Sequence, residues 1–126
     1  MTRTELTKYI VDHCSAEPEY IFRDEPDIAV FRHGNNRKWF AIIMKIPAAK
    51  LGLRSREKID IVNFKADPFL ISSLTQQPGF FPAYHMSKVH WITAALDGSA
   101  NDEDILMLLD MSFDMTGVRH KAKTGA

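Results

Sequence analysis

The stretch that decides the fold is IAVFRHGNNRKWFAIIMKI, residues 28–46. Two runs rich in β-branched and aromatic residues, 28–31 and 39–46, flank His33-Gly34-Asn35-Asn36, whose composition is typical of a tight turn. Turn residues between two such runs predict a β-hairpin, because they bring the neighbouring strands together in antiparallel order. The stretch therefore indicates an antiparallel sheet.

Further elements are expected on both sides of this hairpin. Thr2 and Glu5 have the spacing of a capping box and predict a first helix that ends near Ser15. Pro82 predicts that the strand containing it lies at an edge of the sheet, because proline has no N–H group to donate to a neighbouring strand on both sides. The remaining pattern predicts, in order, a half-buried strand over 58–64, a helix over 68–76, a hairpin of strands over 80–86 and 90–96, and a helix over 101–117.

Two of these helices have predicted core faces. Asp67 and Pro68 have the pattern of an N-cap followed by a first helical residue, which leaves three apolar residues of that helix available for burial: Phe69, Leu70 and Leu74. The last helix begins with acidic residues and should bury one face formed by Ile105, Leu108, Leu109 and Ser112.

The element order predicts an α+β domain of two layers. We expect an antiparallel sheet of about five strands with helices on one face, in the order α-β-β-β-α-β-β-α. The length of 126 residues suits one domain, which we assign to residues 1–118, and residues 119–126 are expected to form a flexible tail. The polar start, the lack of a long apolar stretch and the single cysteine lead us to expect a cytoplasmic location.

Charge is distributed unevenly along the chain. The formal net charge is zero, yet residues 1–31, 32–65 and 66–126 have local balances of minus four, plus seven and minus three. A neutral total argues against a uniformly basic polyanion-binding protein. The central block contains nine basic residues: Arg32, Arg37, Lys38, Lys45, Lys50, Arg54, Arg56, Lys58 and Lys65.

The central basic block has two interpretations. Cationic hairpin tips could neutralise DNA phosphates without reading the base sequence, with Trp39 as an aromatic beside the charge. The candidate contacts are Arg37, Lys38, Lys50, Arg54, Arg56 and Lys58. Alternatively, these side chains only keep the open face and the edges of the sheet soluble.

The sequence contains few motifs typical of catalytic, metal-binding or cofactor-binding sites. His85 and His90 flank the turn of the last hairpin but lack a third ligand at a suitable spacing, so we predict no metal site. Cys14 is expected to be buried rather than reactive. No signature of a known catalytic or cofactor-binding site occurs, and we therefore expect a protein that is not an enzyme and holds no cofactor. The row Met107, Met111 and Met115 either flanks the core or docks a peptide.

Two segments resemble the MmcQ/YjbR-like proteins: residues 63–68, NFKADP, and residues 78–93, PGFFPAYHMSKVHWIT. The likeness extends to Phe40-Ala41 and to the acid-capped last helix. The resemblance implies a CyaY-like fold, similar in layout to secretion chaperones. It also implies a small bacterial protein of the kind commonly described as a candidate for DNA binding, without a set of catalytic residues. Likeness to the chaperones adds an alternative, a protein- or peptide-binding module that uses the sheet edge or the methionine row.

The residues of the two signatures suggest a second candidate site. Lys65 is expected to reach the tip of the last hairpin, and Trp91 to fill the core between sheet and helices. A rim would then gather around Lys65, with Asp67 and Pro68 positioning the neighbouring helix, or else the same residues only clamp the hairpin. The members of this rim near Lys65 are Tyr84, His85, Lys88 and His90.

Overall fold

The computed structural model describes residues 1–118. The tail expected over residues 119–126 lies outside the described residues. The elements follow the predicted order, with one additional short 3-10 helix, η1, between the second and third strands. Their bounds are α1 Arg3–Cys14, β1 Ala29–Arg32, β2 Trp39–Pro47, η1 Ala48–Leu51, β3 Lys58–Lys65, α2 Pro68–Leu74, β4 Phe80–Pro82, β5 Trp91–Ala95 and α3 Asp102–Thr116.

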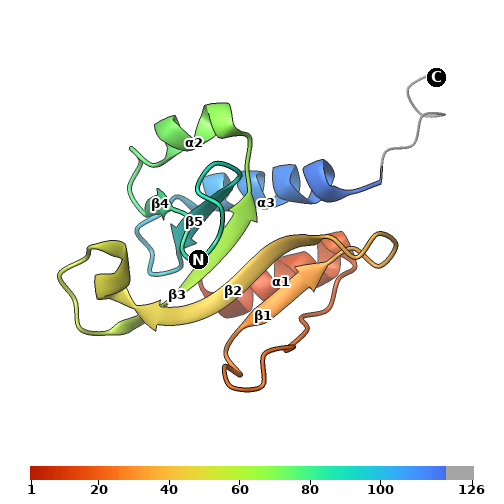
Figure 1. The fold of residues 1–126 in the computed structure, drawn as a ribbon, viewed down its shortest axis with the longest axis horizontal. Coiled ribbons are helices and arrows are strands. Elements are labelled where there is room, and N and C mark those ends of the chain that lie inside the picture. Colours follow the sequence, from red (N-terminus) through yellow and green to blue (C-terminus); the bar gives the residue numbers. More distant parts are fainter. Residues whose placement is uncertain (119–126) are drawn as a thin grey trace.

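The strands form one antiparallel sheet of five strands in the order β1-β2-β3-β5-β4 (Figure 1). β2 and β3 make the longest pairing, from Ala41 opposite Phe64 to Pro47 opposite Lys58. β4 lies at an edge and ends at Pro82, as the proline predicts. This strand has only three residues, so the strand expected over 80–86 is too long: beyond Pro82 the chain leaves the sheet as a loop.

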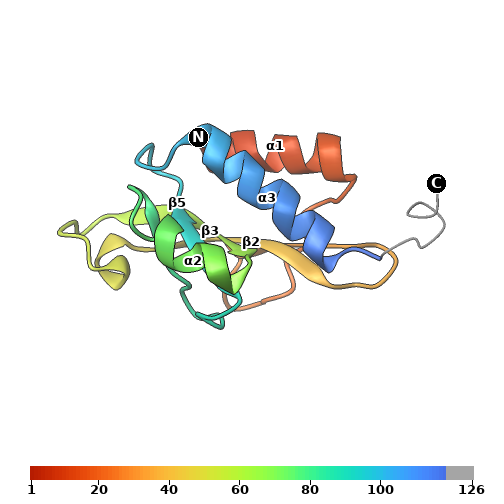
Figure 2. The same ribbon diagram turned by 90° about the horizontal axis from the view of Figure 1, so that it is seen from above.

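Two helices cover one face of the sheet. α1 and α3 lie next to each other above the strands (Figure 2). The core between the layers contains Leu6 and Ile10 from α1 and the predicted apolar face of α3, packed against sheet residues such as Phe31 and Phe64. The two-layer α+β architecture expected from the sequence is therefore confirmed, and within residues 1–118 no helix has the length and apolar character needed to cross a membrane.

The predicted capping residues hold the helix starts. Thr2 and Glu5 form the reciprocal capping box of α1. Asn101 caps α3, and the Asp67 side chain accepts from the N–H of Phe69 at the start of α2. These contacts satisfy backbone N–H groups in the first turns of these three helices.

Side-chain hydroxyls tie α3 to the sheet. The Ser112 hydroxyl donates to the carbonyl of Phe40 at 2.6 Å and accepts from the N–H of Lys65 at 3.0 Å. It therefore bridges β2 and β3 just beyond their last paired residues, Ala41 and Phe64. A polar residue on the buried face of α3 is thus fully satisfied by backbone groups.

Two burial predictions are wrong. Phe69 is 91% exposed and Leu70 36%, because α2 rests beside β4 and β5 on Leu74, as predicted, and on Ile71. β3 is not half-buried: residues 61–64 are all buried, because the face of the sheet away from α1 and α3 also has an apolar covering. The candidate site lies on that second face of the sheet.

Candidate functional site

The face of the sheet opposite α1 and α3 is apolar. Ile42, Met44 and Ile46 of β2 point to this face together with Ile61 of β3, and all four are buried. Half-buried side chains surround them, including Trp39, Ile59, Tyr84, Met86 and Trp91. Lysines and arginines therefore do not form a solvated open face, and the solubility interpretation of the basic block is left with the edges of the sheet.

A groove of about 530 Å³ crosses this second face. Its floor is the apolar row of β2, Ile42, Met44 and Ile46, with Trp39 among the lining residues. One wall is the loop before β1, and the other is the loop between β4 and β5. The remaining lining residues are Phe22, Asp24, Glu25, Pro26, Asp27, Ile28, Lys45, Pro47, Lys58, Tyr84, His85 and Met86.

Hydrogen bonds fix the wall formed by the loop between β4 and β5. The side chain of Asn63, fully buried in β3, donates to the carbonyl of Tyr84 at 3.1 Å. The N–H of Tyr84 donates to the Thr93 hydroxyl at 2.9 Å, and that hydroxyl donates to the side-chain carbonyl of Asn63. The two side chains, opposite each other in β3 and β5, thus satisfy both backbone groups of Tyr84.

The next residue of this wall has an unusual backbone conformation. His85 has φ of 57°, in the left-handed region that non-glycine residues seldom adopt. Its ring stacks on Tyr84 with 4.0 Å between centroids and 9° between planes. Strain of this kind persists only where surrounding contacts impose it, and it concentrates at functional sites. The stacked pair is shared by the groove and by a second, smaller cavity.

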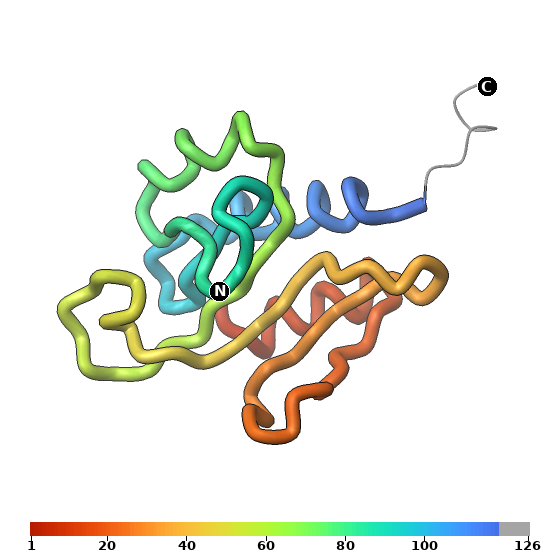
Figure 3. Tube along the Cα trace, viewed as in Figure 1, coloured from red at the N-terminus to blue at the C-terminus, as the bar shows by residue number. Residues whose placement is uncertain are grey.

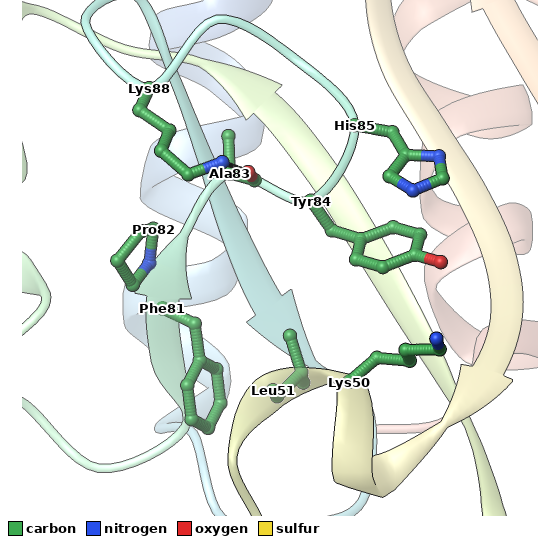
Figure 4. A pocket seen from close by; sticks show the side chains of 8 residues that line it. All are labelled: Lys50, Leu51, Phe81, Pro82, Ala83, Tyr84, His85 and Lys88. Carbon is green, nitrogen blue, oxygen red and sulfur yellow. Dashed lines mark hydrogen bonds between the residues drawn. The ribbon is translucent and has the colours of Figure 1, made fainter.

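The smaller cavity, about 290 Å³, lies between this loop and η1. Figure 4 shows Lys50 extending from η1 toward the side of Tyr84 and His85, with Phe81 and Leu51 below. Lys88 lines the same cavity, and its ammonium donates to the carbonyl of Ala83 at 2.9 Å. The cavity therefore joins two cations to the stacked aromatic pair.

The predicted basic residues lie at two separate tips. Arg37 and Lys38 are in the turn between β1 and β2, whereas Lys50 and its neighbours are in the connection between β2 and β3, at the other end of β2 (Figure 3). Because β2 has nine residues, the tips are about 30 Å apart. The structure thus does not bring the six candidate contacts onto one surface.

Acidic partners compensate several cations of the basic block. Arg32 forms a bidentate pair with Glu19, at 2.8 and 2.6 Å, and this hydrogen bonding lowers the pKa of the Glu19 carboxyl. Arg37 lies close enough to contribute to the same lowering of the Glu19 pKa. Lys45 pairs with Asp60 at 3.4 Å. The turn between β1 and β2 is therefore less cationic than its sequence suggests.

The positive charge of the tip between β2 and β3 is largely uncompensated by acidic side chains. Backbone hydrogen bonds from Ala48 to Glu57 and from Leu53 to Ala48 close this loop, and Gly52 ends η1 with φ of 81°. Glu57 is the single acidic residue within it. Among residues 1–118, no salt-bridge partner is found for four exposed cations of this tip: Lys50, Arg54, Arg56 and Lys58.

The rim predicted around Lys65 is divided by the structure. Tyr84, His85 and Lys88 come together at the smaller cavity, which neither Lys65 nor His90 lines. Asp67 and Pro68 begin α2 as expected. Lys65 is instead opposite Trp91 in the pairing of β3 with β5. Trp91 does not fill the core between sheet and helices, because alternation along β5 turns it to the second face.

The structure also places Cys14 and the methionine row, the other residues singled out in the sequence. Cys14 packs against the main core, and burial raises the pKa of its thiol to about 11. Met107 and Met115 are 46% and 42% exposed, so the methionine row is only partly covered. No cluster of three or more potential metal ligands occurs among residues 1–118.

Sequence reasoning missed the residues that build the groove. The half-buried strand predicted over 58–64 gives Asn63 no role of its own, although an asparagine between Val62 and Phe64 is unusual for a strand and signals a specific hydrogen bond. No local pattern shows that Asp24 and Glu25 would face Tyr84 and Met86 across β2.

A model of the YjbR family matches residues 14–115. The chain belongs to the YjbR family. Among its YjbR-family relatives, the uncharacterized protein YyaQ of Bacillus subtilis is 34% identical over 116 residues, which cover 92% of this chain and 98% of that protein. The uncharacterized protein YjbR of Escherichia coli is 34% identical over 115 residues, covering 90% of this chain and 85% of that protein.

Solved structures show the same fold. A crystal structure of a Pseudomonas syringae protein superposes with a TM-score of 0.91 at 39% identity, covering 93% of this chain and 100% of that one. A solution NMR structure, also of a protein from Pseudomonas syringae, gives a TM-score of 0.86 at 39% identity, covering 95% and 96%. A Deinococcus radiodurans protein shares the fold at 22% identity, with a TM-score of 0.70 over 96% of this chain and 83% of that one.

Proposed function

We propose that this YjbR-family chain is a binding protein without enzymatic activity that contacts DNA phosphates, weakly and without sequence preference, through the tip between β2 and β3. The observation that carries this proposal is the group of four exposed cations at residues 50–58 with no salt-bridge partner within residues 1–118. Phosphate contacts of this kind supply most of the affinity in non-specific DNA binding.

Neighbouring groups extend this cationic surface. Lys50 and Lys88 line one cavity together with the stacked Tyr84 and His85 rings. A cation beside an exposed aromatic ring suits both a phosphate and the sugar or base attached to it. Within residues 1–118, the only helix at this tip is the four-residue 3-10 helix η1, and no α-helix lies there to read bases in the major groove, so the proposal is limited to backbone contacts.

The structure favours this tip over the turn between β1 and β2. Arg37 has Glu19 nearby, whereas Arg54 and Arg56 have only Glu57 in their loop. We therefore assign Arg37 and Lys38 at most a secondary role in the binding surface. The sequence alone predicts all six cations as DNA contacts, and the proposal now ranks the four at the tip between β2 and β3 above the other two.

The test is fluorescence anisotropy of a labelled DNA duplex as a function of salt. With about four phosphates neutralised, the logarithm of the association constant should fall with a slope near −3.6 against the logarithm of the salt concentration. From about 50 to about 200 mM salt, this slope corresponds to an affinity lower by about 150-fold. A chain that shows no binding at low salt contradicts the proposal.

Two double variants with the same change in net charge locate the contact surface. Arg54→Glu with Arg56→Glu should weaken binding at least about tenfold at low salt and reduce the slope by about half. Arg37→Glu with Lys38→Glu should leave the slope nearly unchanged. Equal effects of the two pairs would mean that only the overall charge matters, and the assignment to one tip would be wrong.

The alternative hypothesis, a protein- or peptide-binding module, depends on a different surface. The outer edge of β1 is already engaged by a bridge between Glu19 and Val30, which leaves less free edge for an added strand. The specific observation in favour of peptide binding is instead the groove on the second face of the sheet.

A further inference from the structure

The groove on the second face has unlike charges along its boundary. Asp24, Glu25 and Asp27 line it from the loop before β1, and all three are exposed. Lys45 and Lys58 line it near the end of β2 that leads to η1, and Lys45 is already paired with Asp60. Between these charged margins the floor is apolar. The groove therefore suits an occupant with an apolar core and positive charge toward one side.

The acidic wall is not neutralised by its own surroundings. The guanidinium of Arg3 donates from Nη1 to the backbone carbonyl of Asp27 at 2.7 Å and from Nε to the carboxylate of Asp60 at 3.1 Å. Among residues 1–118, no salt bridge is found for the carboxylates of Asp24, Glu25 and Asp27. Phosphates are repelled by such a wall, so nucleic acid is a poor occupant of the groove.

The shape of the groove favours an extended chain. Its floor follows β2 from Trp39 to Ile46, a length of about 25 Å at about 3.3 Å per residue. About seven residues of extended peptide span that length. An extended chain turns alternate side chains to opposite sides, so apolar residues can face the floor while long basic side chains bend toward the rim.

Exposed apolar residues directly precede the acidic wall in the chain. Tyr20 and Ile21 are 59% and 46% exposed, and Phe22, which lines the groove, is 38% exposed and packs edge-on against Trp39 at 6.3 Å between centroids. Aromatic rings beside carboxylates provide favourable contacts for an ammonium or guanidinium group. The basic side chains of an occupant would thus find both charge and aromatic surface here.

We propose that the groove between the loop before β1 and the loop between β4 and β5 binds an extended peptide segment of another protein, about seven residues long, in which apolar and basic side chains alternate. Charge complementarity with Asp24, Glu25 and Asp27 selects the basic residues, and the row of Ile42, Met44 and Ile46 receives the apolar ones. This site adjoins the cationic tip proposed to contact DNA and shares Lys58 with it, but its acidic wall and apolar floor lie outside that tip.

The experiment uses a synthetic, labelled seven-residue peptide in which leucine alternates with lysine, with both ends blocked. Anisotropy should show saturable binding, and NMR shift changes should concentrate at Trp39, Met44 and Tyr84. Replacing lysine by glutamate in the peptide, or leucine by serine, should weaken binding at least about tenfold. Equal binding of the serine peptide would show that charge alone acts, and would overturn the proposal.

Two charge-reversal variants provide the matched control in the protein. Asp24→Lys with Glu25→Lys should weaken binding of the leucine–lysine peptide at least about tenfold without weakening DNA binding. Glu103→Lys with Asp114→Lys gives the same net charge on α3, on the other face of the sheet, and should leave the peptide affinity unchanged. Equal loss in both variants, or shift changes confined to Met107 and Met115, would contradict the proposed site.

A second copy of the chain is the competing occupant. The proposal expects a monomer by light scattering at the concentrations of the binding experiment. A dimer that Asp24→Lys with Glu25→Lys dissociates would instead assign the groove to self-association, and it would overturn the assignment to a peptide of another protein.

Discussion

The Asn63 side chain on β3 holds the carbonyl of Tyr84 at 3.1 Å, although 21 positions separate the two residues in the chain. Thr93 completes the contact from β5 by accepting from the N–H of Tyr84. The groove wall that includes Tyr84 and His85 is therefore attached to the centre of the sheet rather than to its own loop. Its position depends on two buried polar side chains.

Replacing Asn63 by alanine should lower the free energy of unfolding by about 2–3 kcal/mol. The Tyr84 carbonyl and the Thr93 hydroxyl both lose a partner in a buried environment, and desolvated polar groups without partners are costly. Urea denaturation followed by circular dichroism measures the change. Gln76→Ala, an exposed residue near the end of α2, should stay within about 0.5 kcal/mol of the wild type.

A double-mutant cycle tests whether Asn63 and Thr93 act as a unit. Asn63→Ala and Thr93→Val together should cost less than the sum of the single changes, with a coupling of about 1 kcal/mol or more. Strict additivity would show that each residue contributes independently, and would contradict a shared attachment of the loop.

Local chemistry explains why much of the fold could be predicted from the sequence. The turn at residues 33–36 and the proline at position 82 influence only the adjacent backbone. The turn correctly predicted that β1 pairs with β2, and the proline correctly predicted that β4 lies at an edge. The buried face of α3 follows from helical spacing alone. These features need no information from distant parts of the chain.

The residues that misled the prediction are those decided by distant contacts. Asn63 is polar yet fully buried, because Thr93 and the Tyr84 backbone satisfy it. Phe69 is apolar yet exposed, because α2 rests on its other face. The groove combines an acidic loop with β2 and a loop more than 50 positions later, so its charge pattern could not be read along the chain.

Gly79→Ala should destabilise the protein far more than Gly98→Ala. Both glycines have positive φ, 83° and 90°, which costs a residue with a side chain about 1–2 kcal/mol. A Cβ on Gly79 would also overlap the backbone of Ala100, whereas nothing lies within 4 Å of a Cβ on Gly98. We expect about 3 kcal/mol or more for Gly79→Ala from thermal or urea denaturation. Similar losses for both variants would mean that the chain shifts to admit the methyl group.

Cys14 should react slowly with a thiol reagent in the folded protein. Burial, and secondarily Asp110 and Asp114, raise the pKa of the thiol from 9.0 to about 11. At pH near 8, the thiolate fraction is then about a hundredfold smaller than in the unfolded chain. Reaction with Ellman's reagent should therefore accelerate strongly in denaturant. Asp110→Asn should raise the folded rate only modestly, because burial is the larger cause; a folded rate equal to the unfolded rate contradicts this assignment.

His33 should make the stability of the fold sensitive to mild acid. Its ring is buried between Phe40 and Phe113, at 5.1 and 4.4 Å between centroids, and burial lowers its pKa below the ordinary 6.5. Because the Thr116 hydroxyl donates to the carbonyl of Ser112, it accepts from His33 Nε2 at 2.8 Å.

The direction of the pH effect follows from the lowered pKa. The unfolded chain binds a proton at His33 more readily than the folded one, so the stabilisation is complete above about pH 6.5 and declines as the pH falls toward the folded pKa. His33→Gln removes this titration but keeps a donor for Thr116. Urea midpoints measured between about pH 7 and pH 5 should therefore fall more steeply for the wild type than for His33→Gln. Thr116→Val keeps the histidine, so it should lower stability at pH 7 and retain the steep dependence; parallel curves for wild type and His33→Gln would contradict this role.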